Sequence, residues 1–147
     1  MEKLHKEIDL IQNCINRMAN NSFLLKGWLV SIIVVVVALS PKEIDKLVIA
    51  LVLITAILTF WYLDAYYLRA EKLYRKMYDW VIEKRPQGNE EFLYDLNPHR
   101  FDNAVENLWK IMFSTTLKNF YGTIFTVVLL IILYYSWPFI QKLICRC

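Results

Sequence analysis

The longest unbroken helical pattern in this sequence covers residues 42–85, which contain no glycine or proline and are bounded by Pro41 and Pro86. Residues 46–63 are almost wholly apolar and long enough to cross a bilayer. The residues that follow are amphipathic, because apolar and charged side chains recur there at three- and four-residue steps. Since no helix breaker separates the two halves, we predict one continuous helix, about 60 Å long, that is half in lipid and half in water.

Two further apolar segments predict two more transmembrane helices. Residues 23–40 form the first span, with Lys26 near enough to its boundary to reach water. Residues 119–140 form the third, which Pro138 is expected to end. The polar turn at residues 40–46 is short, so the first two spans should form an antiparallel hairpin.

Three amphipathic helices are expected outside the lipid, at residues 1–20, in the extension of the central helix to residue 85, and at residues 98–118. The polar stretch at 20–22 should end the first. Asn97 followed by Pro98 should start the last, which continues into the third span. The predicted fold is therefore an all-α membrane protein with three transmembrane helices, two of which extend into a small bundle with the N-terminal amphipathic helix.

An apolar seam is expected to close this bundle within one chain or to join several copies of the chain. Its residues recur at helical steps and are Leu4, Ile8, Ile11, Ile15 and Met18 in the first helix, with Tyr74 and Met77 in the central one. The first set is short for an independent coiled coil. Both arrangements are therefore open at this point.

Charge and composition place the chain in a membrane with its N-terminus inside the cell. Of its 147 residues, 57% are hydrophobic, and these lie in blocks within a single domain, residues 1–147. Thirteen of the seventeen basic residues lie on the side of the N-terminus, which the positive-inside rule makes cytoplasmic. Because both water-exposed parts hold equal numbers of acidic and basic residues, we expect no nucleic-acid partner.

The polar residues near the predicted lipid boundary are the candidate functional residues. Asp64 directly follows the second apolar run, where a carboxylate is costly unless it meets water, a cation or a pore. Lys26 should lie at the same depth, so the two form either an ion pair that holds the hairpin or part of the mouth of an oligomeric pore. The full set of boundary candidates is Lys26, Asp64, Arg69, Ser114, Thr115 and Thr116.

Residues typical of catalysis or metal binding do not converge in the sequence, so we expect no enzyme, no cofactor and no metal site. His5 and His99 lie in separate segments without a partner cysteine. The cysteines of the C-terminal CxC, Cys145 and Cys147, could bind a soft metal or cross-link two chains, but two free thiols on a frayed tail are favoured. The hydroxyls at 114–116 should bond to their own helix or across to a neighbour.

Three motifs resemble a family of small bacterial integral membrane proteins. They read NSFLLKGW at residues 21–28, FWYLDAYYLR at 60–69 and YRKMYD at 74–79, with a weaker match at 114–121. This resemblance implies a multi-pass protein of the bacterial inner membrane. The hairpin with a cytosolic helical extension is also similar in architecture to the two-helix membrane effector modules of antiviral systems.

Two functions fit these predictions. The preferred one is an oligomeric membrane effector that perturbs or permeabilises the inner membrane in antiviral defence, since a single three-span chain encloses no aqueous path. The alternative is a membrane anchor or adaptor that recruits a soluble cytosolic protein. Its exposed recruiting residues would be Phe92, Tyr94 and Trp80.

Overall fold

A computed structural model of the protein describes residues 2–39 and 46–144, and within these residues the chain is helical, without strands. The elements are α1 (Glu2–Ala38), α2 (Lys46–Lys84), η1 (Arg85–Gln87), η2 (Pro98–Ala104), α3 (Leu108–Met112) and α4 (Thr115–Ile144). The predicted all-α class is confirmed. Residues 40–45 of the predicted turn lie outside the described residues, as do Cys145 and Cys147.

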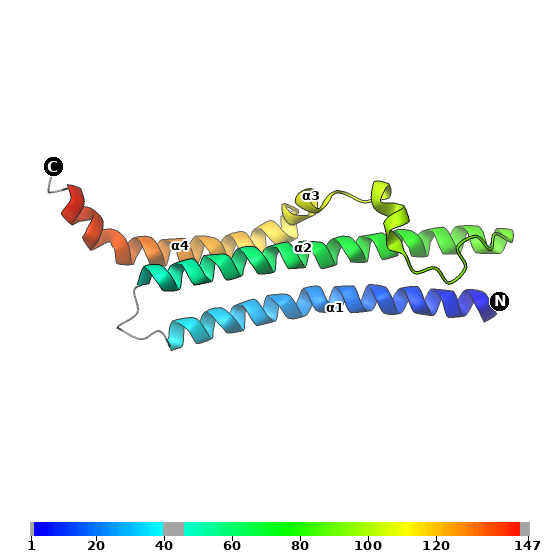
Figure 1. Cartoon of the computed structure of the whole chain (residues 1–147), viewed down its shortest axis with the longest axis horizontal. Helices are drawn as coiled ribbons and strands as arrows, with labels where there is room; N and C mark the ends of the chain where they lie inside the picture. The colour runs from blue at the N-terminus through cyan, green and yellow to red at the C-terminus, as the bar shows by residue number, and fades with distance from the viewer. Residues whose placement is uncertain (1, 40–45, 145–147) are drawn as a thin grey trace.

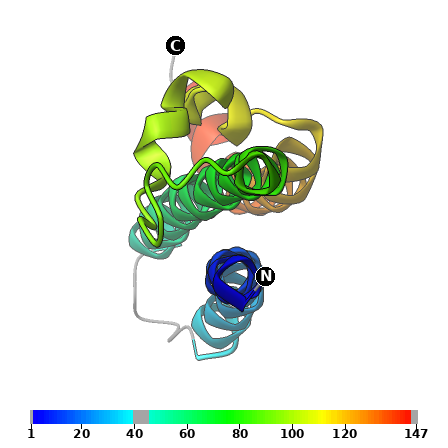
Figure 2. The ribbon, with the colours of Figure 1, turned by 90° about the vertical axis from the view of Figure 1, so that its right-hand side faces the viewer.

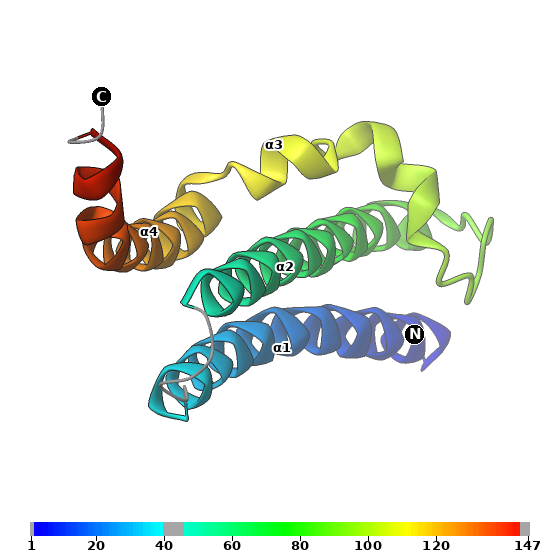
Figure 3. The ribbon, with the colours of Figure 1, turned by 60° about the vertical axis from the view of Figure 1, so that its left-hand side comes forward.

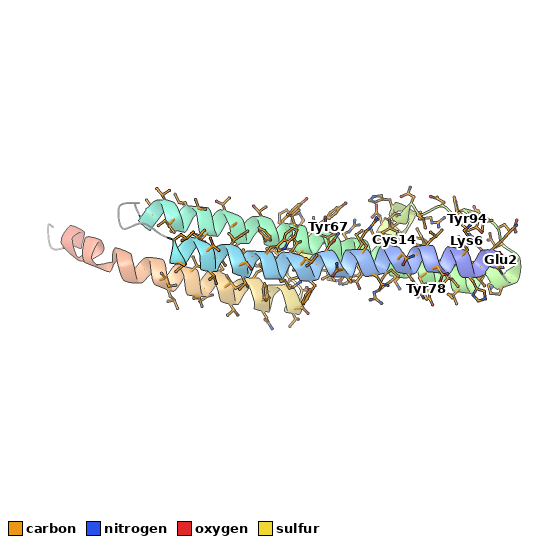
Figure 4. The ribbon with its side chains drawn as sticks, turned by 90° about the horizontal axis from the view of Figure 1, so that it is seen from below. Glu2, Lys6, Cys14, Tyr67, Tyr78 and Tyr94 are labelled. Carbon is orange, nitrogen blue, oxygen red and sulfur yellow. The ribbon has the colours of Figure 1, made fainter. Side chains whose placement is uncertain are left out.

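The long helices form an elongated layer with α2 in the middle (Figures 1 and 3). α1 packs antiparallel along α2, and α4 packs on the first half of α2 from another side, while α1 and α4 make little contact with each other (Figure 2). The C-terminal part of α4 extends past the ends of α1 and α2 (Figure 1). Tyr67 lies midway along the molecule, and Tyr94 lies at the opposite end from the end of α4 (Figure 4).

The continuous central helix is confirmed, since α2 runs from Lys46 to Lys84 without a break. Its first half leaves large apolar side chains exposed, among them Leu51 (57%) and Val52 (53%). The second half of α1 does the same. Among the described residues, α1 and α2 are the two helices long and apolar enough to cross a membrane.

The prediction that residues 20–22 end the first helix is wrong, because α1 continues unbroken to Ala38. Polar residues in a helix interior stop the helix only when their side chains bond to the local backbone. Ser22 instead turns its hydroxyl into the bundle, where it bonds to Asp64. The tertiary contact therefore removes the competing local bond.

The prediction of one helix from residue 98 into the third span is also wrong. Asn97 does cap η2, with its side chain accepting a bond from the His99 N–H, but the chain is then extended at Val105. Asn107 caps the separate short helix α3 by accepting from the Lys110 N–H. Side-chain caps at both asparagines thus stabilise two helix starts where the apolar spacing suggested one continuous helix.

Pro138 does not end the third helix, because α4 continues to Ile144. A proline inside a helix removes one backbone donor and displaces the preceding turn, and the helix can accommodate both by bending. The C-terminal turns of α4 are bent away from its earlier course (Figure 3).

Two apolar clusters hold the layer together. One joins the apolar half of α2 to α1, α3 and α4, and its fully buried residues include Leu29, Ile57 and Leu117. The other joins the first turns of α1 to the second half of α2. It contains most of the predicted seam within one chain, and those seam residues are Leu4, Ile8, Ile11, Ile15, Tyr74 and Met77. Met18 is half-buried.

Candidate functional site

A buried carboxylate lies where α1, α2 and α4 meet. Asp64 is completely buried, and its Oδ2 lies 2.5 Å from Nζ of Lys26 and accepts a 3.0 Å bond from the Tyr121 hydroxyl. The Ser22 hydroxyl donates to Oδ1. We call these four residues the Asp64 layer; three donors from two other helices surround the carboxylate, which offsets the cost of burying its charge.

The Lys26 side chain completes the layer. Its Nζ lies 3.2 Å from the Ser22 carbonyl and 3.0 Å from the Ser22 hydroxyl oxygen, and it keeps 24% of its side-chain surface exposed. The ion pair that the sequence offered as one of two alternatives is therefore present within a single chain.

Trp61 connects the Asp64 layer to α3. Its ring stacks on that of Tyr121, with centroids 5.7 Å apart. Its indole Nε1–H donates a 2.8 Å bond to the Met112 carbonyl at the end of α3. The carboxylate, the aromatic stack and α3 are thus one connected structure.

The other boundary candidates do not join this layer. Arg69 lies on the next part of α2, where it pairs with Asp102 at 2.9 Å and bonds to the Glu106 carbonyl. The hydroxyls at 114–116 were expected to form bonds, but that of Ser114 is buried without a hydrogen-bond partner among the described residues. Thr115 and Thr116 are exposed in the first turn of α4.

Hydroxyls in the apolar halves of the helices bond to their own helix. Ser31, Thr55, Thr59, Thr123 and Thr126 each donate to the carbonyl four residues earlier, at 2.7–2.9 Å. Such bonds let a hydroxyl face an apolar environment without leaving an unpaired donor. These exposed hydroxyls therefore require no aqueous pore.

A second buried carboxylate, which the sequence analysis did not single out, stabilises the far end of the molecule. Glu7 and Arg85 keep only 1% and 6% of their side-chain surface exposed and form a two-pronged ion pair, with both N–O distances 2.7 Å. The Tyr94 N–H also donates to Glu7, at 3.3 Å. The hydrogen bonds that Arg85 donates to Glu7 raise the pKa of Arg85 above its ordinary value.

The loop after η1 is fixed by this pair. Arg85 Nη1 donates to the carbonyls of Asn89 and Glu91, at 2.7 and 2.8 Å. The backbone is left-handed at Phe92 (φ 57°) and Tyr94 (φ 61°), a conformation that costs a bulky residue about 1–3 kcal/mol. We call residues 88–95 the tip loop.

The tip loop carries two exposed aromatic side chains, and Tyr94 lies toward the end of the molecule opposite the end of α4 (Figure 4). Phe92 and Tyr94 keep 47% and 40% of their surface in solvent. Trp80 was expected to be exposed with them but is half-buried, because Arg85 and Arg100 each lie 5.2 Å from its ring centroid. Burial of Arg100 lowers the pKa of its guanidinium.

An open groove of about 740 Å³ runs between α1 and the extended segment after η2, with α2 as its floor. Its basic residues are already paired with acids of the same chain: Lys72 with Glu106 at 3.2 Å, and Arg75 with Glu71 at 2.7 Å. The groove thus offers little unpaired charge for an anionic ligand. Across residues 2–39 and 46–144, no three acidic, histidine or cysteine side chains are grouped so as to hold a metal ion.

Comparison with known proteins gave no match among family models, curated proteins or solved structures. The resemblance of residues 21–28, 60–69 and 74–79 to small bacterial membrane proteins therefore stays a prediction. Within residues 2–39 and 46–144 the fold is all-helical, and two of its helices are long and apolar enough to cross a membrane. Its two most distinctive sites are the Asp64 layer and the tip loop.

Proposed function

We propose that the protein is a three-span adaptor of the bacterial inner membrane that presents the tip loop to a soluble cytosolic protein. The apolar halves of α1 and α2 would be two spans, and α4 the third. The Asp64 layer would then lie near the cytoplasmic lipid boundary, because the exposed apolar surface of α2 ends there. The N-terminus and the second half of α2 would project into the cytoplasm.

The strained tip loop is the observation that carries this proposal. Two bulky aromatic residues, Phe92 and Tyr94, hold left-handed backbone conformations and leave much of their surface in solvent. Strain of this kind persists only where surrounding contacts enforce it, and it is concentrated at functional sites. Here the enforcing contact is the buried Glu7–Arg85 pair, which fixes the loop before any partner binds and so lowers the entropy cost of binding.

The polar residues of the spans support an adaptor more than a pore. Asp64 is buried among partners of its own chain, and the hydroxyls of the apolar halves bond to their own helices. A pore would instead need polar groups directed toward a shared axis.

The oligomeric membrane effector is the second candidate. One observation favours it: α1 and α4 both pack on α2 and make little contact with each other, which leaves an open-sided layer that further copies could close. Its role in antiviral defence rests on the architectural likeness alone.

Photocross-linking in living cells tests the adaptor directly. A photoreactive amino acid at Phe92 or Tyr94 should yield a discrete adduct with one cytosolic protein, and the same residue at Arg75, an exposed position in the second half of α2, should yield none. Addition of Glu7→Ala should reduce the adduct by loosening the loop. Equal labelling at all three positions would contradict the proposal.

Membrane potential and mass separate the two candidates. An adaptor should leave the membrane potential of overproducing cells unchanged and run as a single copy in detergent. A complex of several copies, together with loss of potential, would overturn the adaptor and support the effector.

A further inference from the structure

Two of the most exposed aromatic side chains outside the apolar helix halves belong to one short helix and its C-cap. In α3 and the residue that follows it, Trp109 is 65% exposed and Phe113 is 59% exposed, whereas Ile111 and Met112 are buried against the core. Phe113 follows Trp109 by four positions, and its N–H donates a 3.1 Å bond to the Trp109 carbonyl, so the two rings lie on the same side of this turn.

Contacts with α2 fix the depth of this helix. Met112 accepts the indole bond of Trp61, and the Phe113 ring lies edge-on to the Trp61 ring, with centroids 5.6 Å apart. Trp61 is three residues before Asp64 and stacks on Tyr121. α3 therefore lies level with the Asp64 layer, where the apolar half of α2 ends, and it stands out from α2 beside the start of α4 (Figures 1 and 3).

The surroundings of α3 have the mixed character of a lipid headgroup layer. Phe23 of α1 is 74% exposed and Tyr62 of α2 is 47% exposed near the same depth. The first turn of α4 exposes polar residues, among them Thr116 and Lys118. Aromatic rings beside polar and basic groups are typical of the boundary between acyl chains and headgroups.

We propose that α3 is an interfacial foot, which lies in the cytoplasmic headgroup layer with Trp109 and Phe113 inserted among the lipids. This inference rests on the proposed spans, since without them there is no lipid at this depth. A second copy or a soluble protein is less suited as the occupant, because two other helices also expose aromatic rings near this depth, at Phe23 and Tyr62. The foot would fix the depth and rotation of the helix layer in the membrane.

Depth-dependent fluorescence quenching tests the foot. A fluorescent probe is attached to single cysteines at positions 109, 113, 94 and 52, in a chain whose native cysteines are replaced by serine, and the protein is reconstituted into phosphatidylcholine vesicles. Lipids that carry a quencher near the headgroup should quench positions 109 and 113 at least threefold more than position 94. A water-soluble quencher should show the opposite order.

Position 52 separates failure of the foot from failure of the spans. Val52 is exposed in the apolar half of α2, and a probe there should respond to lipids that carry a quencher deep in the acyl chains. Suppose that position 52 responds to the deep quencher but positions 109 and 113 respond to the aqueous quencher, or to neither the aqueous nor the headgroup quencher. The foot is then wrong, and the proposed spans stand. If the water-soluble quencher quenches both position 52 and position 109, the proposal that the helices span a membrane fails.

Discussion

The described residues bury two carboxylates completely, and each is surrounded in a different way. Asp64 lies where the apolar half of α2 ends, and it is held by one lysine and two hydroxyls from α1 and α4. Glu7 lies at the end of the molecule that carries the tip loop, where Arg85 donates to both of its carboxylate oxygens and the Tyr94 N–H donates a third bond. The first site joins three long helices, whereas the second joins α1 to η1 and to the tip loop.

The two basic partners differ in their access to water, and this difference determines how well each site should tolerate the loss of its carboxylate. Lys26 keeps a quarter of its side-chain surface exposed, so that its ammonium can extend to water if Asp64 is lost. Arg85 keeps only 6%, and its guanidinium is fixed by the carbonyls of the tip loop. We therefore expect the Glu7 site to be the more sensitive.

The largest effect is expected for Glu7→Ala, which leaves the buried Arg85 without its carboxylate. Breaking a buried ion pair in this way costs about 3–5 kcal/mol. The free energy of unfolding should fall by that amount in detergent, and hydrogen exchange should accelerate in the tip loop. Asp9→Ala, an exposed change on the same helix, is the matched control and should cost less than about 0.5 kcal/mol.

Asp64→Ala should cost less, about 2–3 kcal/mol, because the lysine can reach water and the main loss is of hydrogen bonds to a charged group. The same denaturant titration measures it. In a chain that already carries Lys26→Ala, Asp64→Ala should lower the free energy of unfolding by less than it does alone, because no unpaired cation is then left behind. A cost for Asp64→Ala above that for Glu7→Ala would reverse the comparison.

Trp61→Phe tests whether the indole bond of Trp61 holds α3 against the Asp64 layer. This change keeps an aromatic ring against Tyr121 but removes the indole bond to the Met112 carbonyl. We expect a loss of about 1 kcal/mol in the free energy of unfolding, with faster hydrogen exchange in α3. No change in α3 would mean that the bond does not hold this helix in place.

Tyr94→Gly tests the strain at the tip loop. Glycine adopts a left-handed conformation without cost, so the free energy of unfolding should rise by about 1 kcal/mol. Tyr94→Ala, which keeps the backbone strain, should give no such gain. Under the adaptor proposal, Tyr94→Gly should weaken the photocross-link at position 92 even though the protein is more stable.

The smallest effect concerns an exposed carboxylate, Glu106. Hydrogen bonds from Lys110 and Lys72 lower its pKa below the ordinary value. The stability that the Glu106 carboxylate contributes is therefore fully present above the pKa of this group in the unfolded chain. It is lost as the pH falls through the lower pKa of the group in the folded chain. Hydrogen exchange near α3 should accelerate slightly over that acidic range, and Glu106→Gln should remove the dependence.

The sequence revealed Asp64 but not Glu7, for a physical reason. A single carboxylate after an apolar run is conspicuous because it is costly there, so that its pairing with Lys26 could be predicted. Glu7 lies among other charged residues of an amphipathic helix, where most carboxylates are solvated. Its burial depends on Arg85, 78 residues later, and no local pattern encodes that contact.

The fold was predictable to a similar extent. The absence of glycine and proline correctly predicted the unbroken α2, and the apolar spacing of residues 4–15 correctly gave one side of the seam. Two of the errors in helix boundaries occurred where a short polar side chain can bond either to the local backbone or to a distant partner. Ser22 bonds across to Asp64 and lets α1 continue, whereas Asn107 bonds locally and starts a new helix.

An accessibility scan along α2 tests the central claim that this helix is half in lipid and half in water. Nitroxide side chains are introduced one at a time at its exposed positions in vesicle-reconstituted protein, and collisions with oxygen and with an aqueous nickel chelate are compared. The positions are Val48, Leu51, Leu58, Tyr62, Tyr66 and Lys76. The account predicts that oxygen dominates up to position 58 and nickel dominates at position 76, with the change close to Asp64; nickel access at every position would contradict it.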